Sequence, residues 1–108
     1  MTVLLTRVSL EPIQWEARTG LDGQGVAAYD SPMDLDARVV VEDMVARRAD
    51  GTEVRTTVTC WLPNLGDPLP THDDRVTVRG AAYIVVEHAE GRTLGGALDH
   101  VRLRCREE

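Results

Sequence analysis

The sequence predicts an all-β domain, a small antiparallel β-barrel of about six strands with one long loop excursion. Segments in which apolar and polar residues alternate recur along the chain, and turn-forming residues separate them. Phe is absent, so Val, Leu and Ile must fill the interior, which suits strands. No segment has convincing helical periodicity. A β-sandwich is an alternative to the barrel, and a short helix near Thr2 or Leu94 is compatible with the sequence.

The composition bounds the class of protein. The 108 residues fit a single domain spanning 1–108. The 12 basic and 18 acidic residues give a net charge of −6, which opposes tight wrapping of nucleic acid. Residues 1–7 lack the basic start and apolar stretch of a signal peptide, and no run approaches the roughly 20 apolar residues of a membrane span. We therefore expect a soluble protein made inside the cell.

The first predicted strand follows Pro12. Ile13, Trp15 and Ala17 alternate with polar residues, whereas a helix would need apolar residues three and four apart. Because Pro12 has no backbone N–H to donate, we expect a sheet edge or a bulge at that position.

The segment 19–36 is crowded with glycines and acids. Its candidate functional residues are Gly20, Asp22, Gly23, Gly25, Asp30, Asp34 and Asp36. This density of turn formers predicts a long loop that leaves the fold, with residues 26–29 as its apolar anchor. Long loops in small domains are uncommon and often functional, although a merely floppy surface loop is the plain alternative.

A strand is predicted over 37–46. Its apolar residues Val39, Val41 and Val45 share one face by simple alternation. Asp43 falls on this same apolar side, so we expect a bulge or an emergence from the core near it.

A hairpin is predicted to follow this strand, because Asp50-Gly51 lies between two alternating segments. The return strand covers 53–62 and carries Trp61 on its otherwise polar face. Trp61 is therefore a candidate contact residue, although a lid over the core is an equal alternative. The proline-rich segment 63–72 cannot continue the strand and must cross between sheet edges.

The second half of the chain predicts a hairpin and a closing strand. Strands over 75–79 and 82–88 are joined at Gly80, which permits the reversal. Residues 89–97 contain three glycines and predict a flexible connection. The last strand, 98–106, alternates cleanly between inward apolar and outward polar residues.

The two cysteines, Cys60 and Cys105, each lie inside a predicted strand. We expect both to be reduced, buried and packed as small apolar residues, with a disulfide as the alternative. Their spacing makes no zinc site, and we expect no cofactor.

Signals for catalysis are weak. His72 beside Asp73 and Asp74 could in principle form a metal site or a base with its orienting carboxylate, and His88 and His100 lie near strand ends. No metalloprotease or phosphate-binding motif accompanies them. We expect the two aspartates to serve a turn and the start of a strand, and we expect no enzyme.

The outward row of Arg102, Arg104 and Arg106 is the concentrated positive feature of the chain. With Trp61, it is a candidate contact with a neighbouring subunit or ring, or with a phosphate backbone. The alternative is pairing across strands with acids such as Glu53 or Glu87.

Several pieces of the chain occur in an order that suggests a family. They are Gly23-Gln24-Gly25 with Asp30-Ser31-Pro32, Ala37-Arg38-Val39, Asp50-Gly51-Thr52-Glu53-Val54, Asp73-Asp74-Arg75-Val76, Gly80, Tyr83-Ile84-Val85-Val86 and His100-Val101-Arg102-Leu103. From about residue 20 onward, this order resembles the head-completion or stopper proteins of long-tailed bacteriophages, also called head-closure or head-tail connector proteins.

The resemblance implies a small β-barrel that works as a homo-oligomeric ring, typically of about twelve copies, in the virion neck. The ring would be assembled in the bacterial cytoplasm, dock below the portal and adaptor, help to retain packaged DNA and present the tail attachment surface. DNA would pass through it without sequence-specific binding. The same part occurs in phage-derived gene transfer particles. The alternatives are another neck or tail component, such as the tail terminator, and a cellular β-barrel module that binds peptide or glycan through Trp61 and Tyr29.

In this family a long loop reaches toward the central channel and gates it. The matching position is 19–36, with 47–52 as the second candidate. The aspartates of a loop repeated around a ring would form an acidic girdle that repels DNA, and the glycines would let the loop swing. This hypothesis comes from the composition of the loop.

Overall fold

The computed structural model describes residues 10–21, 24–48, 50–63, 69–92 and 98–108. Thr2 and Leu94, where a short helix stays open, lie outside these ranges. The strands are β1 (Glu11–Glu16), β2 (Arg18–Leu21), β3 (Ala27–Tyr29), β4 (Met33–Arg47), β5 (Glu53–Pro63), β6 (Arg75–Val78), β7 (Ala81–Arg92) and β8 (Leu98–Glu107).

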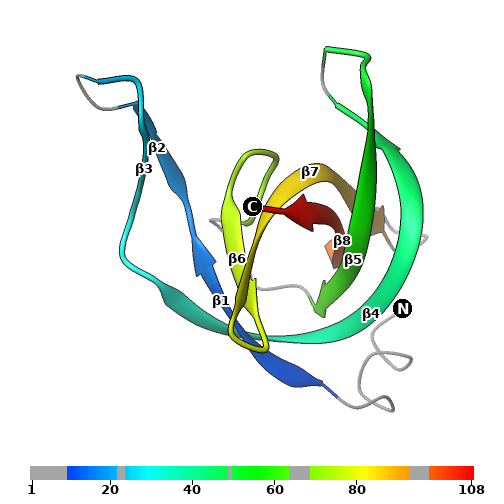
Figure 1. The fold of residues 1–108 in the computed structure, drawn as a ribbon. Coiled ribbons are helices and arrows are strands. Elements are labelled where there is room, and N and C mark those ends of the chain that lie inside the picture. Colours follow the sequence, from blue (N-terminus) through cyan, green and yellow to red (C-terminus); the bar gives the residue numbers. More distant parts are fainter. Residues whose placement is uncertain (1–9, 22–23, 49, 64–68, 93–97) are drawn as a thin grey trace.

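Six of these strands form a closed barrel in the order β1-β4-β5-β8-β7-β6 (Figure 1). Every neighbouring pair is antiparallel, and β1 closes the barrel by pairing with both β4 and β6. The predicted all-β barrel is confirmed. Pro12 pairs with β4 and lies just beyond the end of the β1–β6 ladder, which begins at Ile13, so its missing N–H costs no hydrogen bond to β6.

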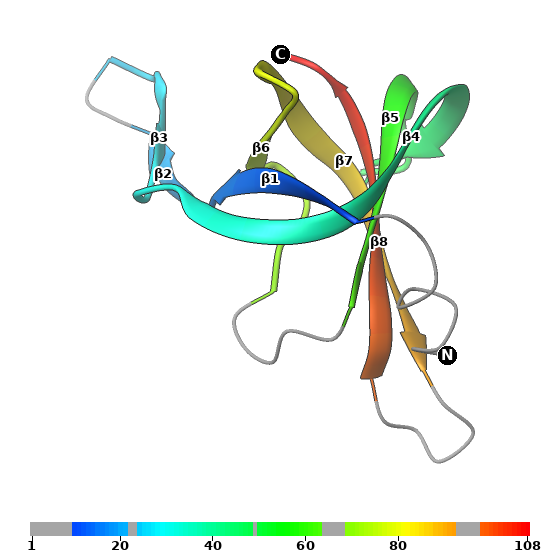
Figure 2. The same ribbon diagram turned by 90° about the horizontal axis from the view of Figure 1, so that it is seen from below.

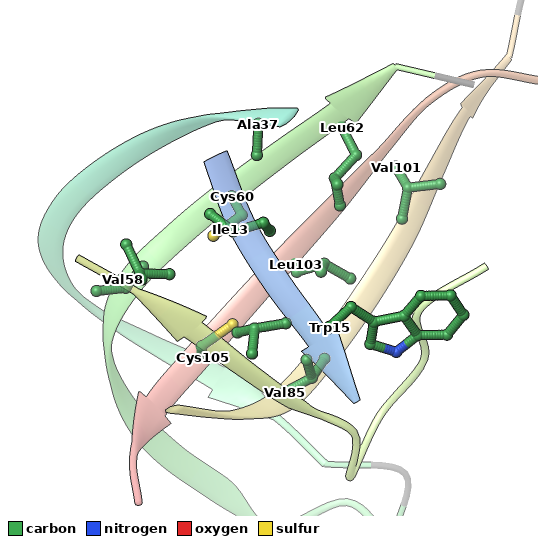
Figure 3. Close-up of a cluster of buried hydrophobic side chains, with 12 residues drawn as sticks. Ile13, Trp15, Ala37, Val58, Cys60, Leu62, Val85, Val101, Leu103 and Cys105 are labelled. Atoms are coloured by element: carbon green, nitrogen blue, oxygen red, sulfur yellow. The ribbon is translucent and has the colours of Figure 1, made fainter. Parts of the chain in front are cut away.

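The interior is filled mainly by small apolar side chains that alternate along the strands (Figure 3). The buried cluster comprises Ile13, Trp15, Ala37, Val58, Cys60, Leu62, Val76, Val78, Val85, Val101, Leu103 and Cys105. Each fully buried Val or Leu contributes about 1.5 to 3 kcal/mol relative to an exposed one. The period-two pattern of the sequence thus decides which face of each strand turns inward.

Both cysteines are free and fully buried, which confirms their predicted role as small core residues. A hydrogen bond with the Cys60 thiol, together with burial, raises the pKa of the Cys105 thiol. Cys105 therefore stays protonated and unreactive inside the barrel.

The hairpins follow the predicted turn chemistry. Gly51 has a φ of 89°, and two backbone hydrogen bonds close the turn, from Arg48 N to Thr52 O and from Gly51 N to Arg48 O. Between β6 and β7, Arg79 and Gly80 have φ values of 51° and 81°, which suit a tight turn between twisted strands.

The bulge predicted near Asp43 is present, because the β4–β5 register shifts between Val41 and Met44. The extra residue reverses the alternation, so Val45 points outward and is 60% exposed. Val41, at the start of the shift, is 66% exposed. The prediction that Val45 shares one face with Val39 and Val41 is therefore wrong, because the bulge breaks the alternation on which it rested.

Strand β7 continues to Arg92, so the predicted connection over 89–97 is wrong in its first part. Gly91 lies opposite His100 in the β7–β8 ladder. A Cβ atom at Gly91 would overlap the His100 ring in its present position, so glycine here allows close packing and does not mark a turn. Residues 93–97 lie outside the described ranges.

Ion pairs reinforce the seam at which β1 meets β6. Arg79 donates from Nε and Nη2 to the two carboxylate oxygens of Glu11, at 2.8 and 2.7 Å. Arg75 makes a similar two-pronged contact with Glu16, its direct partner across the β1–β6 ladder. The Arg79 hydrogen bonds hold the pKa of Glu11 below its ordinary value.

We expect Glu11→Gln to lower stability slightly at neutral pH and to make no difference in acid. The lowered pKa means that wild-type Glu11 contributes stability above the ordinary carboxyl pKa of 4.5, and that this contribution disappears as pH falls through the lowered value. Thermal unfolding of both proteins across this pH range checks the sign. A difference that grows toward acid pH would contradict it.

Candidate functional site

A two-stranded ribbon leaves the barrel and is its most prominent projection (Figures 1 and 2). Strands β2 and β3 continue the β1–β4 ladder outward: Trp15 lies opposite Met33, Asp30 N donates to Ala17 O at 2.8 Å, and Arg18 lies opposite Tyr29. We call residues 18–29 the ribbon. Every residue of β2 is exposed, so the ribbon stands free of the core.

The ribbon corrects the predicted loop over 19–36. Its sides are strands, and β4 already begins at Met33. Asp34 and Asp36 therefore lie in the barrel wall, opposite Gln14 and Pro12 of β1. The signal that marks this strand is the alternation of Met33, Leu35 and Ala37 with the two aspartates, which the acidic composition concealed.

The remaining candidate loop residues are spread along the ribbon. Asp30 lies at its base, while Gly20 and Gly25 have φ values of 142° and 80° in β2 and near the tip. Asp22 and Gly23 lie outside the described ranges. Asp30, Asp34 and Asp36 therefore do not lie together at the tip of the ribbon. The hypothesis of an acidic girdle around DNA required them there.

Two exposed apolar side chains flank the described part of the tip, which also holds Gln24. Leu21 and Val26 are 60% and 58% exposed, and Leu21 lies opposite Ala27. Sequence reasoning missed this feature, because it interpreted residues 26–29 as an anchor into the fold. Exposed apolar side chains on a free projection are typical of a contact with another molecule.

A buried carboxylate fixes the point where the ribbon departs. Asp74 is 3% exposed and accepts hydrogen bonds from the indole Nε1 of Trp15 at 2.8 Å, from Arg18 N at 2.9 Å and from Thr71 N at 3.0 Å. It therefore joins the core, the first residue of β2 and the segment before β6. The expected turn role of Asp74 is confirmed, and it extends to the base of the ribbon.

The other side of the ribbon base is held by a stacked arginine. The Arg75 guanidinium lies 4.3 Å from the ring centre of Tyr29 while its nitrogens contact Glu16. A hydrogen bond with Glu16 is the main cause of the raised pKa of Arg75. Tyr29, a candidate for peptide or glycan contact, thus has one ring face covered by an arginine.

The second candidate gating segment, 47–52, forms the end of the β4–β5 hairpin. A groove of about 370 Å³ lies beside it, and its lining includes Arg18, Arg48, Arg106, Asp50 and Asp73. The hairpin and the ribbon are separate projections of one barrel (Figure 2).

The outward row of β8 is partly paired within the chain. Arg102 and Arg104 both approach one carboxylate, that of Glu87, at 3.1 and 3.6 Å. Glu53 instead pairs with Arg47. Of the two acids named as alternatives, Glu87 therefore does contact the row, and one negative charge is shared between two positive ones.

Trp61 lies next to this row. It is half-buried, it faces Arg102 across the β5–β8 ladder, and the Arg38 guanidinium lies 5.1 Å from its ring centre. Trp61 is thus part of a mixed basic and aromatic surface and does not cover the core.

The histidines do not assemble a catalytic arrangement. The rings of His72 and His88 stack at 5.9 Å, and the Thr71 hydroxyl contacts Nδ1 of each. Asp74 faces Trp15 instead of His72. Within the described ranges, no three side chains of His, Cys, Asp or Glu are grouped as ligands of one metal ion. The part of the chain that the structure describes also holds no helix long and apolar enough to cross a membrane.

The barrel and its ribbon can be compared with known proteins. Neither family models nor curated proteins match this sequence. A chain of a gene transfer agent virion shares the fold. That solved structure, described as the virion of a native gene transfer agent particle, matches with a TM-score of 0.57 and 20% sequence identity. The match covers 94% of this chain and 97% of that chain.

The coverage means that the two chains share the barrel as a whole and not one hairpin of it. The β-barrel that the resemblance implied is therefore confirmed. The stopper role stays a prediction, because the likeness at this identity concerns the fold.

We expect Asp74→Asn to reduce the free energy of unfolding by about 2 to 4 kcal/mol, since one amide nitrogen must replace an oxygen that accepts from N–H groups. Chemical denaturation measures this loss. Asp73→Asn is the matched control: Asp73 has a φ of 70°, which asparagine tolerates, and a 3.6 Å contact with Arg18, so its change should stay below about 0.5 kcal/mol. Equal effects of the two substitutions would show that the buried carboxylate has no special role.

Proposed function

We propose that this chain is a structural protein of a phage-like virion, either a long-tailed phage or a gene transfer particle. In this role it forms the stopper ring in the neck, between the portal and adaptor above and the tail below. The observation that carries the proposal is the near-complete mutual coverage with a chain of a gene transfer agent virion. The order of sequence motifs that resembles stopper proteins supports it independently.

The geometry suits a ring that surrounds a channel. A closed barrel has no open edge within its wall, so it can pack beside copies of itself without strand exchange. The ribbon is the projection that reaches away from this wall (Figure 1). Asp74 and Arg75 fix its base, and the glycines at 20 and 25 allow its outer part to adopt more than one path.

The tip suggests how such a ring retains DNA. Leu21 and Val26, repeated around a ring, would close an apolar constriction across the channel. Apolar side chains offer no charge to the phosphates, so DNA could pass once the ribbons separate. This replaces the acidic girdle, because Asp34 and Asp36 belong to the barrel wall.

The alternatives have less support. A tail terminator is expected to mix helix with strand, and the described residues contain strands and turns only. A peptide- or glycan-binding module would use open faces of Trp61 and Tyr29, yet an arginine stacks on each ring.

Electron microscopy of the purified protein mixed with portal and adaptor proteins tests the proposed location. We expect an additional ring below the adaptor, formed of many copies of this chain. Protein that stays dispersed while the portal and adaptor assemble normally would contradict the stopper role.

Shortening the ribbon tests its role in retention. Replacement of residues 21–27 by a two-residue Asn-Gly turn joins Gly20 to its partner Ala28, keeps the base contacts at Arg18 and Tyr29 and removes the exposed Leu21 and Val26. We expect particles that assemble and package DNA but then lose most of it, measured as nuclease-resistant DNA per particle. The control replaces residues 48–52 of the β4–β5 hairpin with the same turn and should retain DNA. Full retention by the shortened ribbon would rule out the gating role.

A further inference from the structure

The outer surface of β8 and its neighbours forms a basic face. Two rows cross it at right angles to the strands: Arg38, Trp61 and Arg102 lie in one, and Val40, Thr59 and Arg104 lie in the next. Arg106 continues the line of arginines along β8. We call Arg102, Arg104 and Arg106 the arginine face; Arg38 lies on β4, two residues from Asp36. Within the face, Arg102 and Arg104 share the carboxylate of Glu87.

This face contains hydrogen-bonding groups without partners. The Nε atoms of Arg102, Arg104 and Arg106 are buried and make no hydrogen bond, and neither does the hydroxyl of Thr59, which is only 1% exposed. The alternation of β5 turns Thr59 outward, toward the arginines, because its neighbours Val58 and Cys60 belong to the core. Buried donors that lack acceptors are unfavourable, so the arginines of this face are only partly satisfied within their own chain.

Two acidic residues lie on the outer surface of another strand of the barrel, β4. Asp34 and Asp36 are exposed on the outer surface of β4, where Gln14 and Pro12 of β1 lie opposite them. Their contact with the rest of the chain is slight: Gln14 donates to Asp34 at 3.4 Å. We call Asp34 and Asp36 the aspartate pair. Strand β5 lies between β4 and β8, so one strand separates the aspartate pair from the arginines of β8.

The arginine face and the aspartate pair match in spacing as well as in charge. The aspartates alternate along β4, and Arg102, Arg104 and Arg106 alternate along β8, so side chains of both rows repeat about every 6.8 Å. Two carboxylates can therefore approach consecutive guanidinium groups, the pairing that arginine geometry favours.

We propose that the arginine face of one copy binds the aspartate pair of the next copy. Because the two surfaces differ, this contact is head-to-tail, and repetition builds a ring or an open chain. The inference deepens the proposed function, on which its biological setting rests, by naming the surfaces through which neighbouring subunits of the ring meet.

A second copy fits this surface better than a nucleic acid does. The chain carries a net charge of −6, which repels a phosphate backbone, whereas the same acidic excess supplies carboxylates to a neighbouring copy. Glu87 also lies within the arginine face and would face any bound phosphate.

A charge exchange tests the contact directly. One variant carries Arg102→Glu and Arg106→Glu, which leaves the Arg104–Glu87 pair in place; the other carries Asp34→Lys and Asp36→Lys. Alone, each places like charges in every contact, so we expect self-association to weaken by about tenfold or more. Mixed, the variants present complementary charges at both kinds of contact, so assemblies of alternating composition should return.

Sedimentation velocity measures the assembly, and native mass spectrometry measures its composition, expected to be equal parts of the two variants. The matched control, Arg47→Glu with Arg55→Glu, makes the same charge change on the β4–β5 hairpin and should assemble like the wild type. Thermal unfolding of each variant verifies that it is folded, and wild-type assembly should weaken as salt is raised.

Several results would overturn the proposal. They are wild-type protein that stays monomeric, variants that assemble as the wild type does, and a mixture that fails to recover. Loss of binding to double-stranded DNA in the arginine variant, with its assembly unchanged, would assign the face to nucleic acid. If electron micrographs still showed a ring below the adaptor in any of these cases, the proposed function would stand. The subunits of that ring would then meet through other surfaces.

Discussion

The structure depends on one buried carboxylate. Asp74 lies where the core, the ribbon and the segment before β6 converge, and it accepts hydrogen bonds from all three. A charge removed from water in this way is stable only when its partners are fixed, so the carboxylate and its donors hold one another in a single arrangement. The direction in which the ribbon leaves the barrel is therefore set from the interior, through Trp15.

In this barrel, the residues that stabilise the fold point inward and the residues available for contacts point outward. Inward residues fill a small core, and closure through the β1–β6 seam leaves the wall without an open edge. Outward residues are then free to carry the arginine face, the aspartate pair and the ion pairs of the seam. A single residue can change the face to which a side chain points. The extra residue of the β4 bulge turns Val45 from the interior to the solvent.

The sequence was sufficient for the class of fold, the hairpin turns and the core positions outside the β4 bulge, because these follow from alternation and from turn-forming residues within a few positions. It misled where composition concealed a pattern, as in the acidic start of β4, and where a glycine served packing, as at Gly91. The Trp15–Asp74 bond joins residues 59 positions apart, and the unpartnered donors of the arginine face depend on three adjacent strands. Neither has a local signature that could be found without the structure.

The composition of the core affects how the sequence of this protein can change during evolution. Apart from Trp15, the buried cluster consists of small or medium aliphatic and thiol side chains, which can be exchanged at roughly constant volume for less than about 1.5 kcal/mol each. Successive exchanges of this kind erase sequence likeness while the barrel survives. The Trp15–Asp74 pair is harder to exchange, because loss of Asp74 leaves the buried indole N–H and two backbone N–H groups without their acceptor. Distant kin should therefore be sought by this pair at its separation along the chain, in preference to the apolar positions around it.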